Sequence, residues 1–213
     1  MDRGLNSLYK ITYKNNNHGP ILNEQDMFIQ TEQTPNPATL KFLPGCPVLE
    51  GGTAFFEAKE AASNSPLALR LFEIEGVTGV FFGGDFITIT KAEDKEWYIL
   101  KPSILGTIME HFTAGRPVIT DASEAMSSHA EASDEDDDEI VSQIKELLDT
   151  RVRPAVAQDG GDIVFHGFEN GIVYLHMQGA CAGCPSSTAT LKMGIENMLR
   201  HYIPEVSEVR ASA

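Results

Sequence analysis

An acidic run near the middle of the chain, EASDEDDDE at residues 131–139, limits what this sequence can fold into. The run holds seven acidic residues, no basic residue and no large apolar side chain. Such a segment buries too little apolar surface to offset its ordering entropy, and its like charges repel one another. We therefore expect a flexible acidic linker over 121–138, with a small α+β domain on each side of it and the two domains moving independently.

The length of the chain agrees with this division, because 213 residues are enough for two small domains that each bury a core. We expect an N-terminal extension without fixed structure at 1–26, a first domain at 27–120 and a second domain at 139–213. The extension lacks the apolar stretch of a secretory signal and is not rich enough in arginine for an organellar transit peptide. We interpret it as a loose extension, or as an upstream start ahead of Met27.

Charge and cysteine content exclude several classes of function. The formal net charge of -15 argues against nucleic acid or an anionic membrane surface as a partner, because phosphate contacts need clustered Lys and Arg. No run approaches the roughly 18 apolar residues of a membrane span. Three cysteines cannot build the disulfide framework of a small secreted domain, so we expect a compartment that keeps thiols reduced and partners that are proteins.

The first domain mixes short strand and helix patterns. MFIQT at 27–31 and the residues 39–43 predict strands, and Pro66 suits the first turn of a helix. GVTGVFFGGDFITITK predicts two strands joined at residues 83–85, in a hairpin turn of the kind that needs positive φ. A closing helix places apolar residues on one side, at Ile104, Leu105, Ile108, Met109 and Phe112.

No catalytic constellation is present in this first domain. Cys46 lies alone in the turn PGCP, with no histidine or acidic residue at ligand spacing, so we interpret it as an ordinary small side chain rather than a metal ligand. His111 lies beside the apolar side of the closing helix and is expected to pack or to face solvent rather than to catalyse.

The second domain opens with an amphipathic helix directly after the acidic run. QDGGDI breaks that helix, and DIVFHGF and GIVYLHMQG predict two strands around a turn at residues 169–171. A last helix ends by Pro204. The expected order is helix, strand, strand, cysteine loop, helix. Apolar residues at helical spacing mark the two helices: Ile140, Ile144, Leu147, Leu148, Val152 and Val156 in the first, and Leu191, Ile195, Met198, Leu199 and Tyr202 in the last.

The other two cysteines, Cys181 and Cys184, form a C-x-x-C pair in GACAGCPSS, between a strand end and a helix start. The unpaired N–H groups and the dipole at a helix N-terminus favour thiolate. Pro185 suits the first helical turn, and Ser186 or Ser187 can cap the remaining donors. A lowered thiol pKa serves a metal ligand and a redox nucleophile alike.

Three interpretations compete for this pair. A thioredoxin-like oxidoreductase needs several more strands and helices than the residues after Cys184 provide. An intrachain zinc site needs four ligands, and His166, His176 and His201 have no suitable spacing to the pair. Two chains related by a two-fold axis would instead supply four thiolates, which fit a 4Fe-4S cluster. A cluster held at such an exposed seam would be easily given away.

Long stretches of the sequence resemble one known family. RPAVAQDGGDI, the strand pair and GACAGCPSSTATLKMGIE are similar to the C-terminal domain of NifU and of the Nfu iron–sulfur carriers. MFIQTEQTPNPATLKFLPG and WYILKPSILGTIMEHF resemble the N-terminal domain of bacterial and mitochondrial Nfu proteins. The resemblance spans about 27–204, and two long blocks in the family order make it specific.

This resemblance implies a scaffold or carrier, not an enzyme. It would hold a 4Fe-4S cluster between two subunits of a homodimer, with Cys181 and Cys184 as ligands, and transfer it to apo iron–sulfur clients. Upstream cluster assembly proteins would be further partners, and the first domain looks like a docking module. A thiol-disulfide redox protein using the same C-x-x-C is the alternative. We expect a bacterial cytoplasmic location, with the mitochondrial matrix as the alternative.

Overall fold

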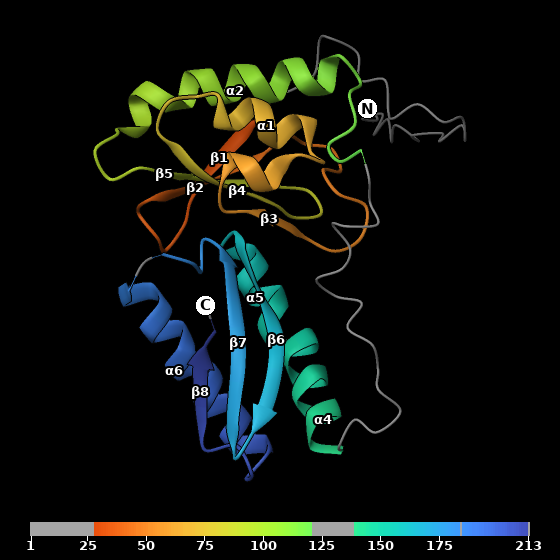
Figure 1. Cartoon of the computed structure of the whole chain (residues 1–213), viewed down its shortest axis with the longest axis vertical. Coiled ribbons are helices and arrows are strands. Elements are labelled where there is room, and N and C mark those ends of the chain that lie inside the picture. Colours follow the sequence, from red (N-terminus) through yellow and green to blue (C-terminus); the bar gives the residue numbers. More distant parts are fainter. Residues whose placement is uncertain (1–27, 121–138, 184, 213) are drawn as a thin grey trace, which may run out of the picture.

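The structure, a computed structural model, describes residues 28–120, 139–183 and 185–212 (Figure 1). The predicted extension at 1–26 and the predicted linker at 121–138 lie outside the described residues. The described parts form two α+β units, each with its own sheet, its own helices and its own hydrophobic core. The predicted fold class of two small α+β domains is therefore confirmed.

The first domain is built on a five-stranded antiparallel sheet with the strand order β1-β2-β5-β4-β3. Strand β2 coincides with the predicted strand at 39–43, whereas β1 begins three residues later than predicted and β3 was not predicted. The strands are β1 (Gln30–Gln33), β2 (Thr39–Leu43), β3 (Ala54–Phe56), β4 (Val77–Phe82) and β5 (Ile87–Lys91).

Two helices, α1 (Pro66–Phe72) and α2 (Trp97–Thr113), cover one face of this sheet, and a short 3-10 turn, η1 (Lys59–Ala62), precedes them (Figure 1). Helix α1 begins at Pro66 as predicted, because the Ser65 hydroxyl accepts a hydrogen bond of 3.1 Å from the N–H of Ala68. Helix α2 is the predicted closing helix, and it continues through Pro102.

The buried side of α2 differs in part from the prediction. Ile104 and Ile108 are fully buried as expected, whereas Met109 is 44% exposed and the prediction for it is wrong. His111 is fully buried instead, because it follows Ile104 and Ile108 at the spacing of one helix face. Of the two expectations for His111, packing is therefore the one that the structure confirms.

The turn between β4 and β5 lies where the sequence predicts it but not in the predicted conformation. Neither Gly83 nor Gly84 has a positive φ. Gly83 is instead required by space, since a Cβ atom there would lie 2.3 Å from the ring of Phe86. The close approach of an aromatic ring, rather than backbone freedom, explains this glycine.

The second domain packs helices against a three-stranded sheet with the order β6-β7-β8. The pair β6–β7 is the predicted hairpin, and its turn has positive φ at Asn170 and Gly171. Strand β8, parallel to β7, was not predicted. The elements are α4 (Glu139–Leu147), the π-helical turn η3 (Leu148–Val152), α5 (Arg153–Gln158), β6 (Gly161–Glu169), β7 (Ile172–Gly179), α6 (Pro185–Tyr202) and β8 (Glu208–Ala211).

The core of the second domain confirms most of the apolar pattern. Ile144, Leu148 and Val156 are buried on the first helical segment, and Ile195 and Leu199 on α6. Tyr202, which the pattern placed with them, is 46% exposed at the end of α6. No helix in the described ranges is both long and apolar enough to cross a bilayer.

The two domains touch, and the sequence did not predict this contact. One end of the β6–β7 pair, together with the end of α5 and the start of the loop that leads to α6, meets the sheet face opposite α1 and α2 (Figure 1). Side chains of β2 and β5 donate hydrogen bonds to backbone carbonyls at this end of the second domain. Composition alone shows that a linker is acidic, but it does not show whether the folded faces on either side fit each other.

Candidate functional site

Cys181 lies in the tight turn that follows β7, and its side chain is 6% exposed. Its N–H donates to the carbonyl of Gln178 at 3.3 Å, and its own carbonyl accepts from the Thr188 hydroxyl at 2.9 Å. The turn is therefore tied to both β7 and α6. Cys184 lies outside the described residues, so of the predicted ligand pair the structure describes Cys181.

The glycine pair at residues 160–161 packs directly against this turn. The carbonyl of Gly160 accepts a hydrogen bond of 3.1 Å from the N–H of Ala180. Gly161 lies directly against the thiol: a Cβ atom there would be 2.6 Å from the Cys181 Sγ and 2.7 Å from the Gln178 carbonyl oxygen. The motif QDGGDI thus provides the space in which the cysteine turn packs.

Burial controls the electrostatics of the Cys181 thiol. Its pKa is raised to about 12, chiefly by removal from water and to a smaller extent by the negative charges of Asp159 and Asp162. The prediction that the helix N-terminus favours the thiolate is therefore wrong for this thiol in this arrangement. Helix α6 begins only at Pro185, beyond the turn, and the burial of Cys181 outweighs any effect of the helix dipole.

An ion pair that sequence analysis missed lies next to the site. The Arg153 guanidinium on α5 donates from Nε to one Asp162 carboxylate oxygen and from Nη2 to the other, both at 2.9 Å. A third bond of 2.9 Å joins Arg153 Nη1 to Asp149. The Asp162 side chain is only 4% exposed, so the two-pronged contact with arginine compensates a buried charge at the start of β6. The only feature of the sequence that pointed to this ion pair was Asp162, an acidic residue directly after two glycines.

Four side chains of the first domain reach the same end of the second. Thr88 donates to the carbonyl of Gly160 at 2.7 Å, and Thr53 to the Asp162 carboxylate at 2.9 Å. Lys41 donates to the carbonyl of Gln158 at 3.0 Å. The Asn36 amide donates to the carbonyl of Ala182, inside the C-x-x-C motif, at 2.9 Å. These contacts place the first domain directly over the cysteine turn.

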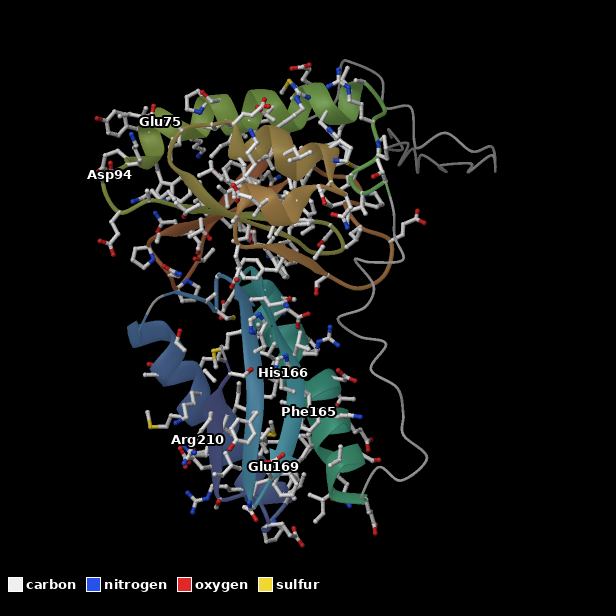
Figure 2. The ribbon with its side chains drawn as sticks, viewed as in Figure 1. Glu75, Asp94, Phe165, His166, Glu169 and Arg210 are labelled. Carbon is white, nitrogen blue, oxygen red and sulfur yellow. The ribbon has the colours of Figure 1, made fainter. Side chains whose placement is uncertain are left out.

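The other candidate ligands are not gathered here. His166 and His176 stack on each other across β6 and β7, with ring centroids 5.7 Å apart, and Figure 2 shows His166 partway along the pair rather than at the end that faces the first domain. Cys46 is buried in the first domain, where burial raises its pKa. Among the described residues no three His, Cys, Asp or Glu side chains are placed to hold a metal ion together.

What this arrangement offers chemically is a soft sulfur donor on a rigid turn. A thiolate from Cys181 is a suitable ligand for iron or zinc, but the described part of one chain does not complete a closed metal site around it. A four-ligand site built on the C-x-x-C pair would need two further ligands, and the described residues of one chain bring no group of three candidate ligands together.

The sequence matches two family descriptions, one in each domain. Residues 29–115 match "Scaffold protein Nfu/NifU N terminal", and residues 144–210 match "NifU-like domain". These two ranges contain the sheet face with Lys41 and Thr88, and the cysteine turn with Cys181.

Several curated proteins are similar over most of the chain. The human protein named "NFU1 iron-sulfur cluster scaffold homolog, mitochondrial" is 57% identical over 184 residues, which cover 86% of this chain and 71% of that protein. The protein of the same name from Drosophila virilis is also 57% identical, with 88% of this chain and 62% of that protein covered. "NifU-like protein 4, mitochondrial" from Arabidopsis thaliana is 55% identical, with 86% and 65% covered.

Among solved structures, the solution structure of a NifU-like protein from Saccharomyces cerevisiae is similar with a TM-score of 0.44 and 26% sequence identity. It covers 52% of this chain and 98% of the yeast chain. The chain spans about two thirds of the length of the three curated relatives named above.

Proposed function

Because this chain belongs to the NifU-like family of iron–sulfur cluster scaffold proteins, we propose that it carries a 4Fe-4S cluster shared between two copies and delivers it to apo-proteins. Cys181 and Cys184 of each copy would supply the four thiolates that such a cluster needs. The cluster is the cargo of this protein, and the role of the protein is to hold and release it rather than to catalyse a reaction on a substrate.

One observation carries this proposal: the Cys181 thiol sits on a turn fixed at both ends, while the described part of the chain provides no third and fourth ligand beside it. A pair of thiols that is half of a tetrathiolate set is completed most simply by symmetry, since a two-fold axis presents the same pair twice. A homodimer on cluster binding follows from that ligand count.

The partners and the location follow from the family. We propose that upstream cluster assembly proteins load the chain and that apo iron–sulfur proteins receive the cluster. The human, fruit fly and Arabidopsis relatives carry the word mitochondrial in their names, which favours the mitochondrial matrix. Our expectation of a bacterial cytoplasmic location has no support from these relatives.

Anaerobic reconstitution with iron and sulfide tests the proposal. A broad absorption band near roughly 400 nm, with about two irons and two sulfides per chain, is the expected result. Rapid passage of that iron to an apo acceptor in the presence of a chelator would support delivery. The thiol-disulfide alternative predicts the opposite result: no iron is taken up, and a bond between Cys181 and Cys184 cycles with a thiol reductant.

A further inference from the structure

A row of side chains crosses the first sheet on the face opposite its helices. Lys41 in β2 pairs with Thr88 in β5, and Thr88 pairs with Phe81 in β4. Their exposed fractions are 7%, 1% and 1%. Their neighbours along each strand pack into the core beneath α1 and α2, so this row points the other way. Phe81 lies outside both hydrophobic cores. The rings of Phe55 and Phe86 flank it within the first domain, and Gly179 of the second domain lies against its ring.

We call Lys41, Phe81, Thr88 and the adjoining Asn36 the docking face. Its polar members bind backbone: Thr88, Lys41 and Asn36 each donate to a main-chain carbonyl of the second domain, at 2.7, 3.0 and 2.9 Å. The positions of these backbone carbonyls depend on the conformation of the turn that carries them, and not on its side chains. The docking face therefore recognises the fold of the cysteine-bearing end, and not merely an apolar surface.

Two glycines permit this close approach. A Cβ atom on Gly160 would lie 2.8 Å from the Thr88 hydroxyl oxygen, and one on Gly179 would lie 2.9 Å from the Phe81 ring. Both glycines also have positive φ, of 84° and 62°. The absence of a side chain at these two positions thus lets the docking face pack closely against the turn that holds Cys181.

The covered region includes the first part of the C-x-x-C motif. The Asn36 amide donates a hydrogen bond to the carbonyl of Ala182, the residue directly after Cys181. Cys181 itself is 6% exposed, and it also packs in the core of its own domain. A second copy of the chain would have to bring its own cysteine turn to the same place for four thiolates to meet. If the second turn met the side of the first that Asn36 and Thr88 contact, the docking face and the second turn could not occupy that place together.

We propose that the docking face masks the cysteine turn in the cluster-free chain, so that docking and the sharing of a cluster between two copies exclude one another. This inference rests on the proposed function, because it assumes that two turns face each other around the cluster. The first domain then acts as an intramolecular cover for the ligand turn, and cluster binding uncovers the docking face.

The first experiment uses the full chain without cluster and measures how fast a thiol reagent labels Cys181. Peptide mass spectrometry separates Cys181 from Cys184 and Cys46. The test variant is Asn36→Asp with Thr88→Val. The carboxylate introduced at position 36 can still accept the hydrogen bond from the Ala38 N–H, which is 3.0 Å long with asparagine. It cannot donate a hydrogen bond to the Ala182 carbonyl. Valine keeps the β-branched shape of Thr88 without its hydroxyl.

The matched control is Asn197→Asp with Thr78→Val, which makes the same chemical changes at exposed positions on α6 and β4. The expected result is labelling of Cys181 at least about tenfold faster in the test variant than in the control, since two interdomain hydrogen bonds are lost. Equal labelling rates in the two variants would overturn the proposal, because Cys181 would then be covered by its own domain alone.

The second experiment needs no substitution and measures carbene footprinting of Phe81 in the wild-type chain, with and without cluster. Side-chain access is the reporter because the backbone pairing of β4 and β5 with their neighbours does not change when the domains separate. We expect Phe81 to be protected without cluster and labelled at least about fivefold more after anaerobic loading. Protection of Phe81 that persists in a loaded dimer would overturn the proposal.

The two experiments separate this inference from the proposed function. If neither wild type nor variant takes up iron, the proposed function fails, and the labelling rate of Cys181 still decides whether the docking face covers the turn. If iron is taken up by a dimer whose docking face stays covered, the proposed function stands and the inference fails.

Discussion

Arg153 and Asp162 form a two-pronged ion pair at the start of β6, with both N···O distances at 2.9 Å. It lies between the helix that precedes the glycine pair and the strand that follows it. The pairing raises the pKa of the Arg153 guanidinium above its ordinary value. The ion pair therefore fixes the backbone on which the cysteine turn rests.

Replacing Arg153 by methionine should destabilise the second domain by about 3 kcal/mol, because it leaves a buried carboxylate without its countercharge. The measurement is urea unfolding of the full chain followed by circular dichroism. Trp97, the one tryptophan in the sequence, lies on α2 and reports the first domain separately by fluorescence. A shift of the Trp97 transition as large as that of the second domain would contradict the local role of this pair.

Gly161→Ala should lower the free energy of unfolding of the second domain by about 2 kcal/mol and reduce cluster content, since its methyl group would overlap the Cys181 sulfur. Gly167→Ala is the control on the same strand, where a Cβ atom meets nothing within 4 Å. The control should be neutral or slightly stabilising. Equal losses of stability and cluster content in both variants would contradict this prediction, because the effect would then come from replacing any glycine of the strand and not from the contact with Cys181.

Low pH should destabilise the first domain through His111. Burial, with smaller contributions from Arg70 and Arg116, lowers the folded pKa of His111 to about 4 from about 6.5. The unfolded chain then binds more protons between these two values, so stability falls as the pH drops from about 6.5 towards 4. At pH 5 the expected loss is about 2 kcal/mol relative to pH 8.

Urea unfolding followed by Trp97 fluorescence at pH 8 and pH 5 measures this loss. His111→Met should remove most of the pH dependence, whereas His201→Gln, at an exposed position in the second domain, should leave it unchanged. An unaltered pH dependence in His111→Met would assign the effect to other groups.

Substitution of the proposed ligands should separate cluster binding from folding. Cys181→Ser and Cys184→Ser should each lose essentially all iron after anaerobic reconstitution, because each substitution is present in both copies and leaves only two of the four thiolates per site. Cys46→Ala should keep the full iron content, since Cys46 lies in the first domain. Circular dichroism of the cluster-free variants checks that each remains folded, and a full complement of iron in either serine variant would refute the ligand assignment.

Local signals were enough to predict much of this fold. Pro66 marks the start of α1, the strand predicted at 39–43 is β2, and Asn170-Gly171 identifies the β6–β7 turn. Each of these is decided by a few neighbouring residues. The position of Cys181 between β7 and α6 was predicted for the same reason.

Long-range contacts account for what the sequence did not reveal. Lys41 and Thr88 follow the pattern of strands with one solvent-facing side, yet a second domain covers them. The thiol of Cys181 follows a strand and precedes a helix, which favours thiolate, yet burial raises its pKa. In both cases the residues that cause the burial lie far away along the chain. The local periodicity of the sequence carries no information about them.

The central claim is that two copies of this chain share one cluster, and native mass spectrometry of anaerobically loaded protein tests it most directly. We predict a species of two chains with one core of about four irons and four sulfides, and cluster-free chains elsewhere in the spectrum. A single chain that carries the complete core, with no added thiol as ligand, would contradict the claim.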